Sequence, residues 1–256
     1  ARSVLFTFDD RICDNYLNSL PLLRKYGHKG VVFAVSNRLE STACLRAATD
    51  EVVAGKTRVP DNVSRPVRQT VQGFSLREDV FVTHAEARQM DEEGTLALAS
   101  HGRGHYGVFA GHDYTGFRQP GTCLRTFYRT EDAPLGGMPD FQVKPGLLHR
   151  AFVPNPDLTK AVSDLVPQDF DAAASFFASE DNIRSLKSLL EGFADRLGRF
   201  ETDEERRHRM WREIAGGKEE LEAILGHEVK TLCWPWGKYS PEAWDLAREA
   251  GFKLFF

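Results

Sequence analysis

Short apolar runs alternate with segments of helical periodicity along much of the chain. The run 3–8 is rich in β-branched and aromatic residues and ends at two carboxylates, which predicts a buried strand that opens into a polar loop. Apolar residues at helical spacing over 16–26 predict a helix that Gly27 ends. Residues 30–35 are again apolar and predict a second strand.

The alternation returns after residue 80. Thr83 and Glu86 match a capping box, so we expect a helix that ends near Gly94, and the run 96–99 predicts the next buried strand. His101 follows this strand immediately.

A second capping box, Thr202 with Glu205, predicts another helix, with the pair Gly216-Gly217 as its weak point. Its core-facing positions are Met210, Ile214, Leu221 and Leu225. The last expected elements are a strand over 229–234, a helix over 241–250 with Ser240 as its cap, and a strand over 252–256.

Two stretches interrupt this pattern. Residues 36–79 show no strong period, and residues 106–179 contain many prolines and are expected to be irregular with some local helix. We interpret both as insertions, at about 36–80 and 106–180, in a single domain that covers residues 1–256. Loops of this length are uncommon unless they serve a function.

Strands that alternate with helices predict an α/β fold with a parallel sheet, whose chemistry is expected in the loops beyond the carboxyl ends of the strands. A chain of 256 residues can bury one sizeable core, and this size is ordinary for one α/β barrel. The net charge of -4 is not that of a nucleic-acid-binding protein, so a small molecule or a carbohydrate is the expected partner.

The cysteines and the N-terminal run bear on the compartment. Four cysteines without a CxxC pair indicate neither a zinc ribbon nor a disulfide framework and fit a reducing compartment. The first apolar run is too short for a membrane span and lacks the flanks of a leader peptide. We therefore expect a cytoplasmic protein without a membrane span.

Three short segments stand at predicted strand ends: 7–10 (Thr-Phe-Asp-Asp), 100–105 (Ser-His-Gly-Arg-Gly-His) and 233–237 (Cys-Trp-Pro-Trp-Gly). Two imidazoles four residues apart can point the same way from one helical turn, and a carboxylate from a neighbouring strand completes a three-ligand metal site with an open position. Spacing alone leaves an alternative open, in which the aspartates cap a helix and the histidines are surface loop residues.

The three segments in this order resemble the motifs of the polysaccharide deacetylase family, which has the NodB-homology fold. The resemblance covers about half of the chain, over residues 20–27, 29–35, 85–105, 213–237 and 243–256. It implies a distorted (β/α) barrel of the NodB-homology type that removes acetyl groups from N-acetylated sugars, and a barrel that is incomplete at the C-terminus is an alternative. It also implies one divalent metal ion, with zinc expected and cobalt, nickel or manganese as alternatives.

Carried over by position, the resemblance makes Asp9 the general base and makes Asp10, His101 and His105 the metal ligands. A backbone N–H in the turn formed by Pro235, Trp236 and Gly237 would donate to the oxyanion. Trp236 is the residue expected to stack on a sugar ring, whereas Trp234 points into the wall of the barrel.

Three positions depart from the family pattern. Arg11 stands where the family has Gly, Gly102 where it has Ser or Thr, and Cys233 where many members have an arginine that orients the base. Arg11 or Arg103 could substitute for that arginine.

The family's general acid is a histidine in a Leu-x-His motif, which would follow a strand like 252–256 and lies outside this sequence. The sequence is then part of a longer protein, or another residue supplies the proton, or the protein binds without catalysis. His112 and His149 are the candidates for a substitute.

The leading hypothesis is a metal-dependent sugar N-deacetylase in surface-polysaccharide biosynthesis, for O-antigen or capsule. One alternative is a hydrolase of a non-sugar amide or imide on the same fold. The other is a catalytically inactive carbohydrate-binding relative.

Overall fold

The computed structural model describes residues 4–10, 13–56, 66–70, 73–76, 81–121 and 135–256. The chain forms two compact units. The first contains residues 1–65, 77–105 and 207–256, and the second contains residues 66–76 and 106–206. The predicted single domain of 1–256 stays a prediction. In the described residues, no helix is both long enough and apolar enough to span a membrane.

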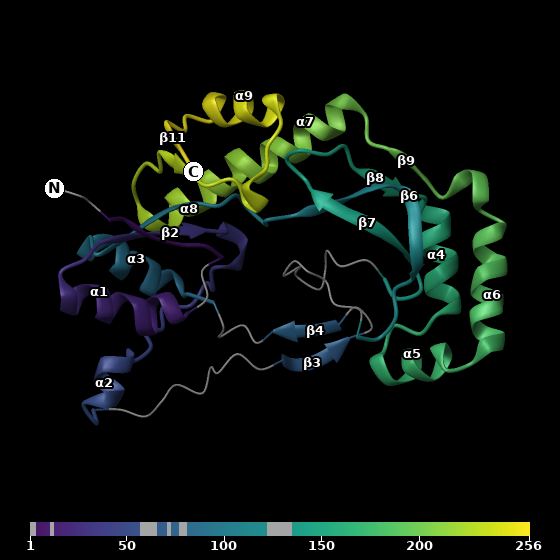
Figure 1. The fold of residues 1–256 in the computed structure, drawn as a ribbon, viewed down its shortest axis with the longest axis horizontal. Helices are drawn as coiled ribbons and strands as arrows, with labels where there is room; N and C mark the ends of the chain where they lie inside the picture. The colour runs from purple at the N-terminus through teal and green to yellow at the C-terminus, as the bar shows by residue number, and fades with distance from the viewer. Residues whose placement is uncertain (1–3, 11–12, 57–65, 71–72, 77–80, 122–134) are drawn as a thin grey trace. The chain divides into compact units, whose positions relative to one another are not determined.

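A five-stranded parallel sheet is the centre of the first unit (Figure 1). Its strands, in spatial order, are β1 (Phe6–Phe8), β2 (Gly30–Ala34), β5 (Leu96–Ser100), β10 (Thr231–Leu232) and β11 (Leu254–Phe255). Ser100 pairs in register with Ala34 on one side and with Leu232 on the other. The loops that follow β2, β5 and β10 therefore leave the sheet at the same edge.

The helices of the first unit largely match the sequence pattern. Helix α1 ends at Gly27 and α3 ends at Gly94, and both glycines have the positive φ that favours glycine, 67° and 63°. A five-residue π-helical turn precedes α1, and a second one precedes α8. The bounds are η1 Asn15–Ser19, α1 Leu20–Tyr26, η2 Ser36–Arg38, α2 Thr49–Val53, α3 His84–Glu93, α7 Asp203–Trp211, which begins in the second unit, η5 Arg212–Gly216, α8 Gly217–Leu225, η6 Pro235–Gly237 and α9 Pro241–Glu249.

Both predicted capping boxes are present. The Thr83 hydroxyl accepts a hydrogen bond from the Glu86 backbone N–H at 3.1 Å, and the Glu86 carboxylate accepts one from the Thr83 N–H at 3.0 Å. Thr202 and Glu205 make the same reciprocal pair at 3.2 and 2.7 Å. Each pair therefore satisfies two backbone N–H groups that otherwise lack a hydrogen-bond partner at the start of the helix.

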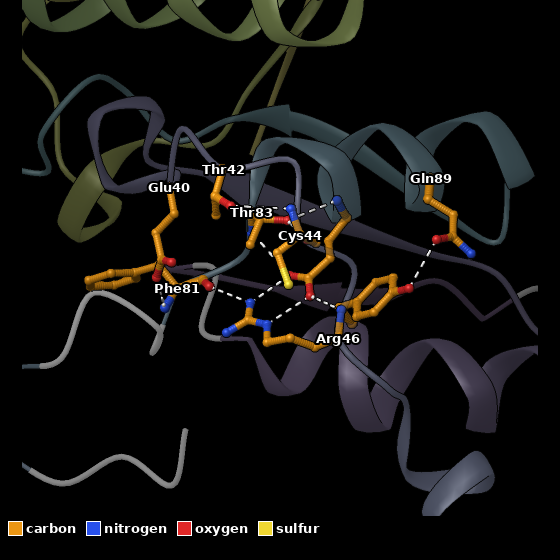
Figure 2. Close-up of polar contacts among 9 residues, drawn as sticks. Glu40, Thr42, Cys44, Arg46, Phe81, Thr83 and Gln89 are labelled. Carbon is orange, nitrogen blue, oxygen red and sulfur yellow. Dashed lines mark hydrogen bonds and ion pairs between the residues drawn. The ribbon is translucent and has the colours of Figure 1, made fainter. Parts of the chain in front are cut away.

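Glu86 also anchors the segment that follows η2. Its carboxylate is fully buried and receives the Arg46 guanidinium through two oxygens, at 2.7 Å from Nε and 2.5 Å from Nη2 (Figure 2). The same guanidinium donates to the Phe81 carbonyl at 2.6 Å, and the Thr83 hydroxyl donates to the Cys44 carbonyl at 2.7 Å. These bonds attach residues 44–46, which have no regular structure, to the start of α3.

The first strand is less buried than its apolar sequence predicts. Val4, Leu5 and Phe6 are 76, 52 and 38% exposed. In the described residues β1 pairs only with β2 and forms an edge of the sheet, so one side of the strand has no neighbouring strand.

The second unit is more regular than the sequence pattern indicates. It contains three antiparallel strand pairs and a group of helices, and most of these elements lie in the stretches interpreted as irregular insertions. The bounds are β3 Pro66–Thr70 with β4 Gly73–Leu76, β6 Gly107–Phe117 with β7 Pro139–Pro145, β8 Phe152–Pro154 with β9 Gly198–Phe200, α4 Pro156–Leu165, α5 Phe170–Phe177, α6 Glu180–Glu191 and η4 Ala194–Arg196.

Prolines suggested breaks in this region because they cannot donate a backbone hydrogen bond. In the structure, three of the described prolines lie where no donor is needed. Pro139 and Pro145 are the first and last residues of β7, and Pro156 is at the first position of α4. The irregular interpretation is therefore wrong for the described residues of 106–179, where the expected local helix is also present.

The second unit has its own apolar core. Phe141 is buried and its ring contacts Phe109 and Tyr114, with centroids 5.2 and 6.1 Å apart. A further buried cluster joins α4, α5 and α6, and its members are Met138, Leu158, Val162, Val166, Phe176, Leu186 and Leu190. Phe109, Tyr114 and Phe117 make further ring and core contacts in this unit.

Candidate metal centre

The candidate metal centre lies beyond the carboxyl ends of the parallel strands. Asp10 follows β1, and His101 and His105 follow β5. One ligand atom from each of the three lies within 4.8 Å of the other two. The structure therefore brings together the three residues that the sequence predicts as metal ligands. A second group of donors, Asp9, His101 and Cys233, satisfies the same distance.

Strained backbone is concentrated in this centre. In the described residues, the non-glycine residues with positive φ are Asp10 at 64°, His105 at 57° and Trp236 at 64°. A left-handed conformation costs an L-residue roughly 1–2 kcal/mol, and such residues cluster at functional sites. The expectation that His101 and His105 share a helical turn is wrong, because residues 101–105 form a loop with Gly102 at φ 78°.

This histidine loop, residues 101–105, has its backbone fixed on two sides. On one side, the Ser36 and Asn37 N–H groups donate to the carbonyls of Gly102 and Arg103 at 3.1 and 3.0 Å. On the other side, the Arg103 N–H donates to the Glu213 carbonyl at 2.8 Å. Because buried backbone groups need partners, these bonds select one loop conformation.

The Glu213 side chain completes the second side. Its Oε1 accepts from the His105 N–H at 2.7 Å, and both carboxylate oxygens accept from the Gly104 N–H at 3.0–3.1 Å. Burial raises the pKa of this carboxyl to about 7, and the two backbone donors oppose that rise. A Cβ at Gly102 would lie 2.7 Å from the same Oε1, so a larger residue at this position would crowd the carboxylate.

Sequence reasoning did not single out Glu213. Its position along the chain offered a signal that could have identified it. Glu213 is next to Ile214 and one turn after Met210, so it lies on the side of the helix that faces the core. Acidic residues are almost never buried without a partner, so a glutamate at such a position indicates a specific acceptor role.

The histidine rings are held neutral. His101 is 3% exposed, and its Nδ1 lies 2.9 Å from the Cys233 carbonyl, so Nδ1–H donates and the lone pair lies on Nε2. Burial lowers the pKa of His101. Burial, and secondly the adjacent His101, lowers the pKa of His105 to about 4. Neutral imidazole is the form that binds metal ions.

Arg38 is the arginine that the structure places at the site carboxylates. Its buried guanidinium donates to Asp10 Oδ1 at 3.3 Å and to the Gly104 carbonyl at 3.3 Å. The sequence pointed instead to Arg11 and Arg103. Arg103 pairs with Glu220 at 2.7 Å, and Arg11 lies outside the described residues.

The turn η6 closes the centre. The backbone N–H of Trp236 points at Nε2 of His105, 3.4 Å away. The rings of Trp236 and His105 stack with their centroids 5.6 Å apart. Trp234 is 3% exposed and packs on Tyr239 and Phe255, which confirms its place in the wall. Pro235 is buried and Gly237 is exposed with φ 60°. Burial and the charges of Asp9 and Asp10 raise the pKa of the Cys233 thiol to about 12.

The two candidate substitutes for the general acid both belong to the second unit. The His112 side chain is 69% exposed. Burial, followed by Lys144 and Arg206, lowers the pKa of His149. A role for either residue stays a prediction.

The fold is α/β, and its carboxylate and imidazole donors gather at the carboxyl edge of a parallel sheet. This arrangement is typical of the class of α/β proteins that hold a metal ion at that edge of the sheet. The sequence model of the polysaccharide deacetylase family matches residues 1–133 and 155–255. The chain therefore belongs to the polysaccharide deacetylase family, as the resemblance of its motifs predicted.

Two solved structures have a similar fold. The deacetylase domain of BpsB from Bordetella bronchiseptica is 20% identical, with a TM-score of 0.55 over 98% of this chain. A de-N-acetylase from Aggregatibacter actinomycetemcomitans is 17% identical, with a TM-score of 0.55 over 99% of this chain. The chain spans 62% of the length of each. No curated protein matches the chain.

The shared architecture is a mixed α/β fold with a curled parallel half-barrel. A complete barrel of the NodB type stays a prediction.

Proposed function

We propose that this chain is a metal-dependent hydrolase that removes the acetyl group from an N-acetylated sugar. The observation that carries the proposal is the convergence of Asp10, His101 and His105 on backbone that is strained at Asp10 and His105. A fold keeps strained residues only when the surrounding structure enforces them, and here that structure aims three metal-binding side chains at one point.

The residues fit a divalent metal ion. One carboxylate and two neutral imidazoles are the usual protein ligands of a catalytic zinc, and three protein ligands leave a position open. Asp10, His101 and His105 would hold the ion, with zinc expected and cobalt, nickel or manganese as alternatives. When bound, such an ion lowers the pKa of a water molecule and polarises a carbonyl group.

The surrounding residues supply orientation and proton transfer. Asp9, next to Asp10 and exposed, would accept the proton of the attacking water. The Cys233 carbonyl fixes the His101 ring, and Arg38 fixes the Asp10 carboxylate. When the lone pair of His105 Nε2 is engaged, the Trp236 N–H loses its acceptor and can donate to the oxygen that gains charge on the substrate.

The finer assignments remain part of the proposal. The substrate would be an N-acetylated sugar of a surface polysaccharide, such as O-antigen or capsule, and the reaction would take place in the cytoplasm. The family supports a carbohydrate substrate. Trp236, half-buried beside His105, would stack on the sugar ring.

The test is acetate release from N-acetylglucosamine oligomers by the zinc-loaded chain, together with its metal content. We expect wild type to release acetate and a chelator to stop the release. Asp9→Asn should keep the ion and lose roughly 10²–10⁴-fold in rate, because it removes only the proton acceptor. His101→Ala should lose the ion.

Asp245→Asn is the matched control, because this aspartate is exposed on α9 and lies outside the candidate metal centre. It should match wild type in metal content and rate. If wild type binds the ion and hydrolyses no acetamide, the carbohydrate-binding alternative holds. Hydrolysis of an imide or non-sugar amide, without acetate release from the oligomers, would favour the second alternative.

A further inference from the structure

Cys233 is a metal-binding side chain that the proposed reaction does not use. It follows β10 and is partly exposed. One donor atom from each of Asp9, His101 and Cys233 lies within 4.8 Å of the other two. The thiol therefore lies within reach of an ion that the carboxylate and the imidazole also contact.

This group and the Asp10 group share His101. The Nδ1–H of His101 is engaged by the Cys233 carbonyl at 2.9 Å, so Nε2 is the nitrogen that either group can use. One lone pair cannot serve two ions. The two groups are consequently alternative positions for a single ion.

We propose that Asp9, His101 and Cys233 form an alternative metal position that binds a thiophilic divalent cation, such as Zn²⁺ or Co²⁺, through the Cys233 thiolate. Thiolate and imidazole ligands favour such ions over hard cations that prefer oxygen. On binding, the S–H bond breaks, the proton passes to solvent, and a sulfur–metal bond forms without any change of oxidation state.

Electrostatics favour a cation at this point. Burial opposes a negative charge on the thiol, and the Asp9 and Asp10 carboxylates add their repulsion to it. A divalent cation offsets that repulsion and is itself attracted by the same two carboxylates. The metal ion and the thiolate can therefore enter together, where the thiolate alone is disfavoured.

Occupancy of the alternative position has a consequence for activity. It engages the Asp9 carboxylate, which under the proposed function must be free to accept a proton. The inference rests on the proposed function in this consequence alone. The metal position itself is tested without any substrate.

The test is a titration of the full chain with Co²⁺, followed by absorption. A thiolate ligand gives a charge-transfer band in the near ultraviolet, whereas carboxylate and imidazole ligands give only the weaker visible bands of cobalt. We expect wild type to show the near-ultraviolet band. Cys233→Ser should lose it and keep the visible bands, because Asp10, His101 and His105 are unchanged.

Three further variants make the test specific. Cys44→Ser removes an exposed cysteine and should keep the band. His105→Ala disables only the Asp10 group, so the band should persist or grow. Asp9→Asn retains the thiol and should weaken the band, which keeps the test valid if Cys233→Ser does not fold.

Two outcomes would overturn the inference. The first is a wild-type chain whose visible cobalt bands saturate while no near-ultraviolet band develops. The second is a band that His105→Ala abolishes together with Cys233→Ser, because Cys233 would then belong to the Asp10 group. Acetate release by wild type is measured separately from the cobalt spectrum. Failure of this inference can therefore be distinguished from failure of the proposed function.

Discussion

Asp10, His105 and Trp236 hold unfavourable backbone conformations, and each of them contributes to the candidate metal centre. A left-handed residue reverses the local direction of the chain, so its side chain leaves in a direction that helix or strand would not allow. This reversal lets His105 face His101 across a loop, with ring centroids 4.9 Å apart. The strain is therefore part of how the donors converge.

Glu213 should control metal affinity without touching the metal. Glu213→Gln retains the size of the side chain and leaves one acceptor oxygen for the N–H groups of Gly104 and His105. We expect metal affinity to fall by about 10–100-fold, as for other residues that orient a metal ligand. The measurement is a competition titration against a chelator, at a pH above 7, where the wild-type carboxyl is ionised.

Glu219→Gln is the matched control, since Glu219 is exposed on α8. It should leave the affinity unchanged. Equal affinities for wild type and Glu213→Gln would show that the Gly104 and His105 bonds do not position the loop.

At the residue scale, donor types were predictable and their orientation was not. Asp9, Asp10, His101 and His105 stand out because polar residues follow apolar strands. Arg38 and Glu213 could not be assigned to the site, because their roles depend on which segments meet after folding. The sign of φ at Asp10 and Trp236 likewise depends on tertiary contacts and not on residue type.

The pair Gly216-Gly217 is better explained by packing than by helix weakness. A Cβ at Gly217 would lie 2.6 Å from the Arg103 nitrogen and 2.7 Å from the Gly102 carbonyl carbon. A Cβ at Gly216 would meet only the flexible Arg103 side chain, at 3.6 Å. The start of α8 therefore packs closely on the backbone of the histidine loop at Gly217, whereas Gly216 faces only a side chain of that loop.

Gly217→Ala and Gly216→Ala should thus have opposite effects. Gly217→Ala must displace backbone, so we expect about 1–3 kcal/mol of destabilisation and weaker metal binding. Gly216→Ala should be neutral or stabilise by up to about 1 kcal/mol, since alanine favours helix. Urea unfolding and metal titration of both variants check this, and equal effects at the two positions would contradict it.

The buried ion pair at the start of α3 should matter more than an exposed one on the same unit. Arg46→Ala leaves the Glu86 carboxylate, which is fully buried, without its guanidinium partner, so we expect a loss of about 3–5 kcal/mol. Arg24→Ala removes an exposed pair with Glu93 and should cost less than about 1 kcal/mol. Urea unfolding compares the two, and similar losses would contradict the anchoring role of Arg46 (Figure 2).

At the element scale, the helix ends could be predicted from local signals in the sequence. Thr83 and Glu86, Gly94, and Ser240 with Pro241 each specify a helix end by a local bond, and the helices begin and end there. The antiparallel pairs of the second unit were missed because their pairing is long-range: Gly107 pairs with Pro145 across a separation that no local period encodes.

At the scale of the whole molecule, the order of strands explains why the site could be predicted before its surroundings. Parallel strands in the order β1-β2-β5-β10-β11 bring the ends of β5 and β10 together, so residues far apart in sequence meet at one edge. The family's ordered motifs encode this arrangement. The division into two units was not predictable, because the second unit begins inside one presumed insertion and extends past the other, to Arg206.

The spread of the donors along the chain links metal to folding. Asp10 and His105 are separated by 95 positions, since 105 minus 10 is 95, and they meet only when the sheet has formed. An ion that binds this arrangement has no comparable site in the unfolded chain. Mass action then adds about 2.7 kcal/mol to the free energy of unfolding when free metal is at 100 times its dissociation constant.

Chelation should therefore lower the unfolding temperature of wild type, although no core residue changes. His101→Ala, which removes the nitrogen common to both metal positions, should unfold at the same temperature with and without chelator. A chelator effect that persists in this variant would place the stabilising ion elsewhere. The unfolding temperature thus becomes a gauge of metal occupancy that needs neither substrate nor spectroscopic ion.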